Sequence, residues 1–137
     1  MLNIKMQREL AARAAAAARN AYAPYSKFRV GAALLPAAGR RVITGCNVEN
    51  SSYGLTHCAE RAALAAAIAA GFRRFKAIAV AVSGNKPAVP CGACLQVLAE
   101  FCGPDCEVFT VAAARPRKIK AYTMRALLPH FFKLNHE

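Results

Sequence analysis

The chain has 137 residues, of which 56% are hydrophobic, and its 19 lysines and arginines against 7 acidic residues give a net charge of +12. This length and apolar content are typical of one domain with a single buried core, which we expect to span residues 1–137. No segment is long and apolar enough to cross a bilayer, and Arg8, Glu9 and Arg13 interrupt any signal-peptide core, so we expect a cytoplasmic protein without a membrane partner.

The first half of the sequence predicts a helix, a β-hairpin and a loop. The alanine-rich start has high helix propensity, Asn3 is suited to the N-cap position, and Pro24 would stop the helix. Two apolar runs flank a Pro-Ala-Ala-Gly turn, as in a hairpin. In chain order, we expect a helix over residues 3–22, strands over 28–35 and 41–46, and a loop over 47–56.

The second half predicts helices that alternate with strands. Residues 77–82 are nearly all apolar, which indicates a strand buried on both faces. Gly71 is suited to end the preceding helix, and Thr123 to cap the last one. The expected elements are helices over 57–70 and 91–101, strands over 77–82, 107–111 and 119–122, and a short helix before Pro129. This order indicates an α/β sandwich with one mixed sheet.

The basic residues gather in three clusters, which we expect at turns or at the ends of elements. A strongly basic surface attracts polyanions, but no aromatic residues interleave with these clusters to stack on bases. We therefore favour solvated surface over a nucleic-acid track, and nucleic acid is not the expected partner. The clusters are Arg40–Arg41, Arg73–Arg74 with Lys76, and Arg115 with Arg117, Lys118 and Lys120.

The six cysteines favour metal binding over disulfides, because no secretory context accompanies them. We assign Cys58, Cys91 and Cys94 to a metal site and expect the other three, Cys46, Cys102 and Cys106, to be small, partly buried apolar residues. A second metal half-site at Cys102 and Cys106 is the alternative, but further ligands are not evident nearby in the sequence.

Three thiolates around a tetrahedral zinc leave one position open for water. Cys58 and the Cys91/Cys94 pair fall at predicted helix starts, where free backbone N–H groups offset the excess negative charge. Glu60 would be an ordinary first-turn glutamate if it stood alone, but beside these thiols it is a candidate to move protons. His57 could be a fourth ligand, yet adjacent residues hardly reach one ion together, so we interpret it as a flanking residue.

Two motifs carry a resemblance to a known family. Cys58-Ala59-Glu60-Arg61 and Pro90-Cys91-Gly92-Ala93-Cys94 resemble the signature of the zinc-dependent nucleoside cytidine deaminases. The similarity covers roughly residues 10–132. It includes residues 21–28 (AYAPYSKF), 30–34 (VGAAL), 45–50 (GCNVEN), 96–98 (QVL) and 127–129 (LLP).

The resemblance implies a three-layer α/β/α sandwich with a mixed five-stranded sheet, and a homotetramer with shared active sites and one zinc per subunit. The implied reaction is hydrolytic deamination of cytidine and 2′-deoxycytidine to uridine and 2′-deoxyuridine with release of ammonia, in pyrimidine salvage. The implied roles are zinc ligation by Cys58, Cys91 and Cys94, proton transfer by Glu60, substrate binding by Phe28, Asn47, Glu49, Tyr53, Ala59 and Phe132, with Phe132 reaching a neighbouring subunit's site, and support by Arg61.

One departure from the family pattern lies beside the metal site. The family usually has arginine directly after the second cysteine of the Pro-Cys-Gly-x-Cys segment, and this chain has Leu95 there. We hypothesise that Arg61 and the helix N-termini alone neutralise the thiolates, which would leave the metal more electron-rich.

Three other functions compete with nucleoside deamination. A deaminase of polynucleotides or tRNA would suit the charge of +12, but Glu49 would repel a phosphate and the chain lacks added binding segments. A deaminase of a cytosine-containing antibiotic is a second alternative, against which the Asn-Val-Glu-Asn segment favours an ordinary ribose. A zinc module without activity is a third, and Glu60 argues against it.

Overall fold

The computed structural model describes residues 1–134, so residues 135–137 of the expected domain lie outside the described residues. Its elements are α1 (Ile4–Ala18), β1 (Val30–Pro36), β2 (Ile43–Cys46), the 3₁₀ turn η1 (Tyr53–Leu55), α2 (Ala59–Ala69), β3 (Phe75–Val82), α3 (Gly92–Ala99), β4 (Cys102–Ala112), β5 (Arg115–Thr123) and α4 (Met124–Leu127). The strands form one sheet in the order β2-β1-β3-β4-β5. β3 and β4 are parallel and the other neighbours antiparallel.

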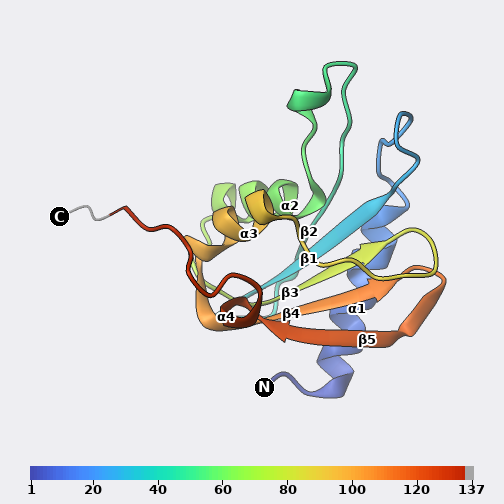
Figure 1. Cartoon of the computed structure of the whole chain (residues 1–137). Coiled ribbons are helices and arrows are strands. Elements are labelled where there is room, and N and C mark those ends of the chain that lie inside the picture. The colour runs from blue at the N-terminus through green and yellow to red at the C-terminus, as the bar shows by residue number, and fades with distance from the viewer. Residues whose placement is uncertain (135–137) are drawn as a thin grey trace.

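The sheet lies between two helical layers, with α1 on one face and α2 and α3 on the other (Figure 1). Successive side chains of a strand point to opposite faces. Leu34 of β1 therefore packs with Leu64 of α2 and Leu98 of α3, whereas Leu35 packs with Leu10 of α1. The predicted α/β/α sandwich with a mixed five-stranded sheet is confirmed.

Glycines let both helical layers approach the sheet closely. A Cβ atom on Gly31 of β1 would collide with the α1 backbone at Ala14 and Ala18, and one on Gly45 of β2 would collide with the α2 backbone at Ala59 and Ala63. The alanines of both helices are small enough to permit this approach. The position of α2 therefore depends on a bare backbone at Gly45.

Several predicted boundaries were wrong by a few residues. α1 ends at Ala18, not at residue 22, because Tyr22 donates its N–H to the Asn47 carbonyl (3.0 Å) and accepts from Glu49 N–H (2.9 Å). These bonds hold Tyr22 extended beside the loop. β5 extends well beyond the predicted run because its polar residues also pair with β4 through the backbone, and β4 begins earlier than predicted because Cys102 pairs with Phe75 of β3. The first turn of the last helix is capped by the Thr123 hydroxyl, as predicted.

Two of the three basic clusters lie where we expected them, and the third does not. Arg40–Arg41 lies in the turn between β1 and β2, and Arg73–Arg74 precedes β3. The cluster from Arg115 to Lys120 lies within β5, an edge strand, where charges discourage pairing with other chains. Among residues 1–134, no helix is long and apolar enough to cross a membrane.

Candidate active site

Two helix starts bring the three predicted cysteine ligands together. Cys58 is the N-cap of α2, Cys91 is the N-cap of α3, and Cys94 lies in the first turn of α3. The three sulfur atoms lie within 4.8 Å of one another. In tetrahedral zinc sites with Zn–S bonds of about 2.3 Å, the sulfurs are about 3.8 Å apart, so this cluster fits a zinc ion without rearrangement of the backbone.

Positive charge and backbone N–H groups surround the sulfurs. Arg61 donates from Nη2 to the Sγ of Cys58 (3.1 Å), and this bond raises the pKa of the guanidinium further. Cys94 donates its N–H to the Sγ of Cys91 (3.5 Å). Burial acts to raise the pKa of Cys91, but hydrogen bonds from the backbone and side chain of Cys94 outweigh it, so this pKa is lowered. The Cys91 thiol therefore ionises more readily than an ordinary cysteine does.

The buried thiol of Cys94 has the opposite tendency. Burial, followed by the negative charge of Glu60, raises the pKa of Cys94 well above its usual range. Three thiolates therefore do not coexist here without a cation between them. A divalent metal supplies that charge, which is why this donor set suits zinc.

Glu60 places a buried carboxyl group beside the thiols. It lies in the first turn of α2 and is only 5% exposed. Burial raises the pKa of this carboxyl, while its own backbone N–H and the charge of Arg61 oppose the shift. A carboxyl with a raised pKa holds a proton more readily than an ordinary glutamate does, which suits an acid–base catalyst.

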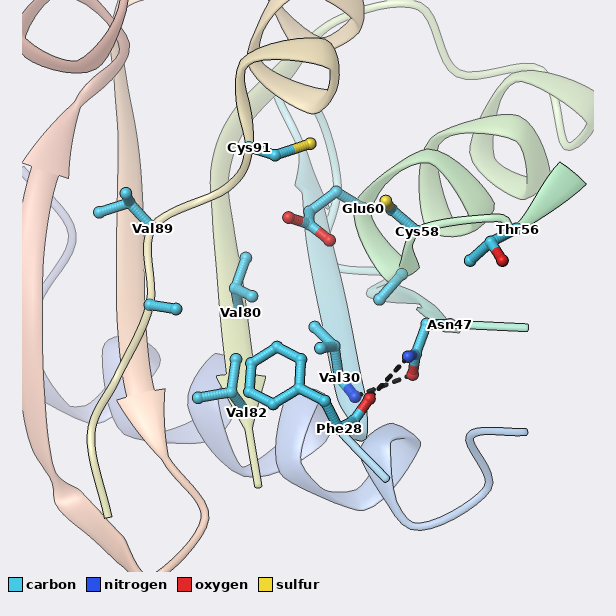
Figure 2. Close-up of a pocket in the computed structure, with 12 residues that line it drawn as sticks. Phe28, Val30, Asn47, Thr56, Cys58, Glu60, Val80, Val82, Val89 and Cys91 are labelled. Atoms are coloured by element: carbon cyan, nitrogen blue, oxygen red, sulfur yellow. Dashed lines mark hydrogen bonds between the residues drawn. The ribbon is translucent and has the colours of Figure 1, made fainter. Parts of the chain in front are cut away.

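A cavity of about 200 Å³ opens in front of Glu60 (Figure 2). Cys58, Cys91 and Glu60 lie at one end, and the ring of Phe28 lies toward the other, near Val82. The wall is mostly apolar, which suits a flat, partly polar ring. It is lined by Phe28, Val30, Asn47, Thr56, Cys58, Ala59, Glu60, Val80, Val82, Ala88, Val89 and Cys91.

Sequence reasoning missed the apolar wall of this cavity. Val80 and Val82 alternate along β3, and Val89 lies in the segment before α3. The signal that could have found the two β3 residues is their place near the carboxyl end of a parallel strand, where α/β proteins bind ligands. Nothing in the sequence singles out Val89.

The Asn47 side chain is hydrogen-bonded to the backbone at the edge of the cavity. Its Oδ1 accepts from Val30 N–H (2.9 Å), and its Nδ2 donates to the Phe28 carbonyl (2.8 Å), as Figure 2 shows. These bonds fix the segment that carries the Phe28 ring. One N–H of the amide remains free of these two bonds, so the same side chain can also donate to a ligand.

Glu49 and Tyr53 lie together on the loop that projects between β2 and α2, outside the main cavity. The Glu49 carboxylate accepts from the N–H groups of Tyr25 (2.9 Å) and Ser26 (3.2 Å) and from the Ser26 hydroxyl. The Ser26 hydroxyl is the largest cause of the lowered pKa of Glu49. Tyr53 packs edge-on against Tyr25, with ring centroids 5.7 Å apart. Thr56 borders both this loop hollow and the main cavity.

The remaining predicted residues separate into two groups. Ala59 is fully buried and lines the cavity, whereas Phe132 is 70% exposed on the C-terminal segment and does not line this chain's own cavity. His57 is exposed, outside the sulfur cluster, and exchanges backbone hydrogen bonds with Val48. Leu95 is 6% exposed and packs in the apolar core between the sheet and α2 and α3.

Comparisons with known proteins agree with this geometry. Residues 4–110 match the family model of the cytidine and deoxycytidylate deaminase zinc-binding region. A cytidine deaminase of Halalkalibacterium halodurans is 48% identical over 93% of this chain and 95% of its own length, and one of Sporosarcina psychrophila is 46% identical over 90% and 89%.

Solved structures show the same relationship. The crystal structure of cytidine deaminase from Burkholderia pseudomallei has a TM-score of 0.82 and 45% identity, covering 96% of this chain and all of that one. That of cytidine deaminase from Mycobacterium tuberculosis has a TM-score of 0.79 and 41% identity, covering 98% and 100%. With three clustered thiols, a buried glutamate and these matches, the chain belongs to the cytidine and deoxycytidylate deaminase family of enzymes.

Proposed function

We propose that this protein catalyses the zinc-dependent hydrolytic deamination of cytidine and 2′-deoxycytidine to uridine and 2′-deoxyuridine, with release of ammonia, as a step of pyrimidine salvage. The observation that carries the proposal is the buried Glu60 carboxyl in a cavity whose end is formed by the sulfurs of Cys58 and Cys91. The relatives named cytidine deaminase, which match along nearly their whole length, support the choice of substrate.

Cys58, Cys91 and Cys94 would hold one zinc ion in each subunit. The bound ion would supply Lewis-acid activation of a water molecule. Arg61 stabilises the negative charge of the ligands through its bond to Cys58. Leu95 carries no charge in the place of the family arginine, so this task falls to Arg61 and to the helix N-termini.

Glu60 would move the protons of the reaction. Its carboxylate takes a proton from the attacking water and delivers it to ring N3, which makes C4 more electrophilic. The hydroxide that remains adds to C4, and Glu60 then takes the proton of the new C4 hydroxyl and gives it to the amino group. The C4–N bond breaks, ammonia leaves, and the C4 carbonyl of the uracil ring forms. The raised pKa of Glu60 suits a group that must hold the proton between these steps.

The cavity and the neighbouring loop would bind the two halves of the nucleoside. The apolar wall with Phe28 suits the pyrimidine ring, and the backbone at Ala59 would contact its polar edge. Asn47 and Glu49 would bind ribose hydroxyls as donor and acceptor, next to Tyr53. Glu49 is fixed by Ser26 and Tyr25 and therefore presents its charge to a ligand without reorganisation.

We further propose that residues 1–137 act as one catalytic domain of a cytoplasmic homotetramer. The C-terminal segment carries Phe131, Phe132 and Leu134 exposed, at 41%, 70% and 70%, which supports contact with a second copy. Phe132 would complete a neighbouring subunit's site, since it lies outside the cavity of its own chain. The six cysteines are unpaired, as suits a reducing compartment.

Replacement of Glu60 by glutamine tests the proposal. Loss of the proton carrier should lower kcat for cytidine by at least about 10²–10⁴-fold, the usual contribution of acid–base catalysis, while the zinc content stays at one per subunit. Exposed Glu100, at the end of α3, provides the matched control Glu100→Gln, which should retain activity. Near-normal turnover by Glu60→Gln would exclude the assigned role.

The basic surface makes deamination of a polynucleotide the alternative function to be tested. The basic row along β5 could attract a polynucleotide. Deamination of single-stranded DNA or RNA at a rate above that of free cytidine would favour this function over nucleoside deamination. We expect ammonia release from cytidine and none from the polynucleotides.

A further inference from the structure

A second group of sulfur atoms lies at the other end of the core, around the start of β4. Cys102 and Cys106 are 7% and 5% exposed, and Met124 is 3% exposed. All three belong to the apolar cluster between the sheet and α2 and α3. None of them takes part in the catalytic site described above.

A bulge brings the two thiols together. Phe75 pairs with Cys102 and Ala77 pairs with Glu107, so β3 advances two residues while β4 advances five. The extra residues Gly103 to Asp105 are exposed, whereas the cysteines on either side of them are buried. Cys106 thus returns to the strand next to Cys102. The neighbouring Cys102 side chain is the largest cause of the raised pKa of Cys106, ahead of burial.

The pairing of β4 with β5 adds the thioether. Val108 pairs with Tyr122, and both pack on the α2 and α3 side of the sheet. At this end of the two strands the last pair is Glu107 with Thr123, so the residues that follow it are Cys106 of β4 and Met124, the first residue of α4. Met124 and Cys102 also line one cavity of about 120 Å³. Three sulfur-bearing side chains therefore lie in the same part of the buried core.

We propose that Cys102, Cys106 and Met124 form a second metal site, which binds one soft monovalent cation of the Cu(I) type. Thiolate and thioether sulfurs select soft ions over Mg²⁺ or Ca²⁺. Binding releases the two thiol protons to solvent and involves no change of oxidation state. The cation would also relieve the mutual repulsion of two adjacent thiolates in an apolar interior.

The residues around the proposed site would admit a cation and offset the negative charge of the thiolates. The small cavity that Cys102 and Met124 line gives an ion a path to two of the three residues, and Arg125 borders the same cavity. Two thiolates with one monovalent cation carry a net charge of −1, which the guanidinium offsets in part. Arg125 also pairs with Asp105 of the bulge (3.5 Å), so the bulge and α4 are tied together over the site.

Copper titration of the zinc-loaded protein tests this site. Cu(I) would be added without oxygen in competition with bicinchoninate, and both bound copper and released zinc would be measured. We expect one Cu(I) per chain with the zinc retained, and we expect Cys106→Ser to lose it. Met124→Leu should weaken binding at least about tenfold, the smallest loss typical for a supporting residue of a metal site.

Two controls make the outcome decisive. Cys46→Ser removes a thiol at the opposite edge of the sheet, in β2, and should bind copper as the unaltered chain does. Met124→Leu conserves volume and keeps the test valid if Cys106→Ser does not fold. The site is refuted if Met124→Leu and Cys106→Ser bind copper as the unaltered chain does, or if copper binds only as zinc leaves.

Discussion

Replacement of Gly45 by alanine should weaken the fold and displace the reactive carboxyl together. Gly45 lies against α2, the helix that carries Glu60 in its first turn. A Cβ on Gly45 would be 2.9 Å from the Ala59 carbonyl oxygen and 2.9 Å from Ala63 Cα, and closer still to Ala63 N. Ordinary Cβ contacts begin at 3.4 Å, so α2 must retreat by at least about 0.5 Å.

The loss of stability and the loss of activity each have an expected size. Overpacking a tightly packed interior costs about 1–3 kcal/mol. In a domain of this length, each kcal/mol lowers Tm by about 4 °C, so a decrease of about 4–12 °C is expected. A misplacement of 1 Å can lower a rate about 10²-fold, so a retreat of at least half that size should lower kcat by at least about tenfold.

The assay combines thermal unfolding with the absorbance change on deamination of cytidine by the zinc-loaded variant. Gly31→Ala is the matched control, because its Cβ would press on α1, which contributes no residue to the cavity. This control should lower Tm while the folded enzyme keeps its kcat. Unchanged Tm and kcat in Gly45→Ala would refute the reasoning, and so would an equal loss of kcat in Gly31→Ala.

Three further changes test individual residues around the site. Asn47→Ala leaves the buried Val30 N–H unpaired, which should cost about 1–3 kcal/mol in thermal unfolding and raise KM, whereas Asn47→Asp keeps the acceptor. The lowered pKa of Glu49 means that its bonds persist below the usual pKa of 4.5 and are lost as pH falls through the folded-state pKa. Ser26→Ala should therefore move the acidic rise of KM to higher pH, and an unchanged KM profile would contradict this assignment. Leu95→Arg buries a charge in the apolar core and should lower Tm by much more than Leu95→Met does; equal Tm values would show that the arginine escapes to solvent or to the thiolates.

The sequence by itself determined the order of the main helices and strands and the chemistry of the central cluster. Helix starts are specified locally, by capping residues and apolar periodicity, so Cys58, Cys91, Cys94 and Glu60 could be assigned to helix N-termini without a structure. The nearly continuous apolar run of β3 likewise indicated a central buried strand. These features depend on residues that are neighbours in the chain.

The tertiary structure decided what depends on distant residues. The two hydrogen bonds of Asn47 connect it to residues seventeen or more positions away, which no local pattern reveals. The exposure of Phe132 depends on the course of the segment after α4, and the common location of Cys102, Cys106 and Met124 follows from strand register and from a bulge of exposed residues. Register is set by the packing of the whole sheet, and for that reason the second sulfur cluster lacked a third ligand in the sequence and gained one in the fold.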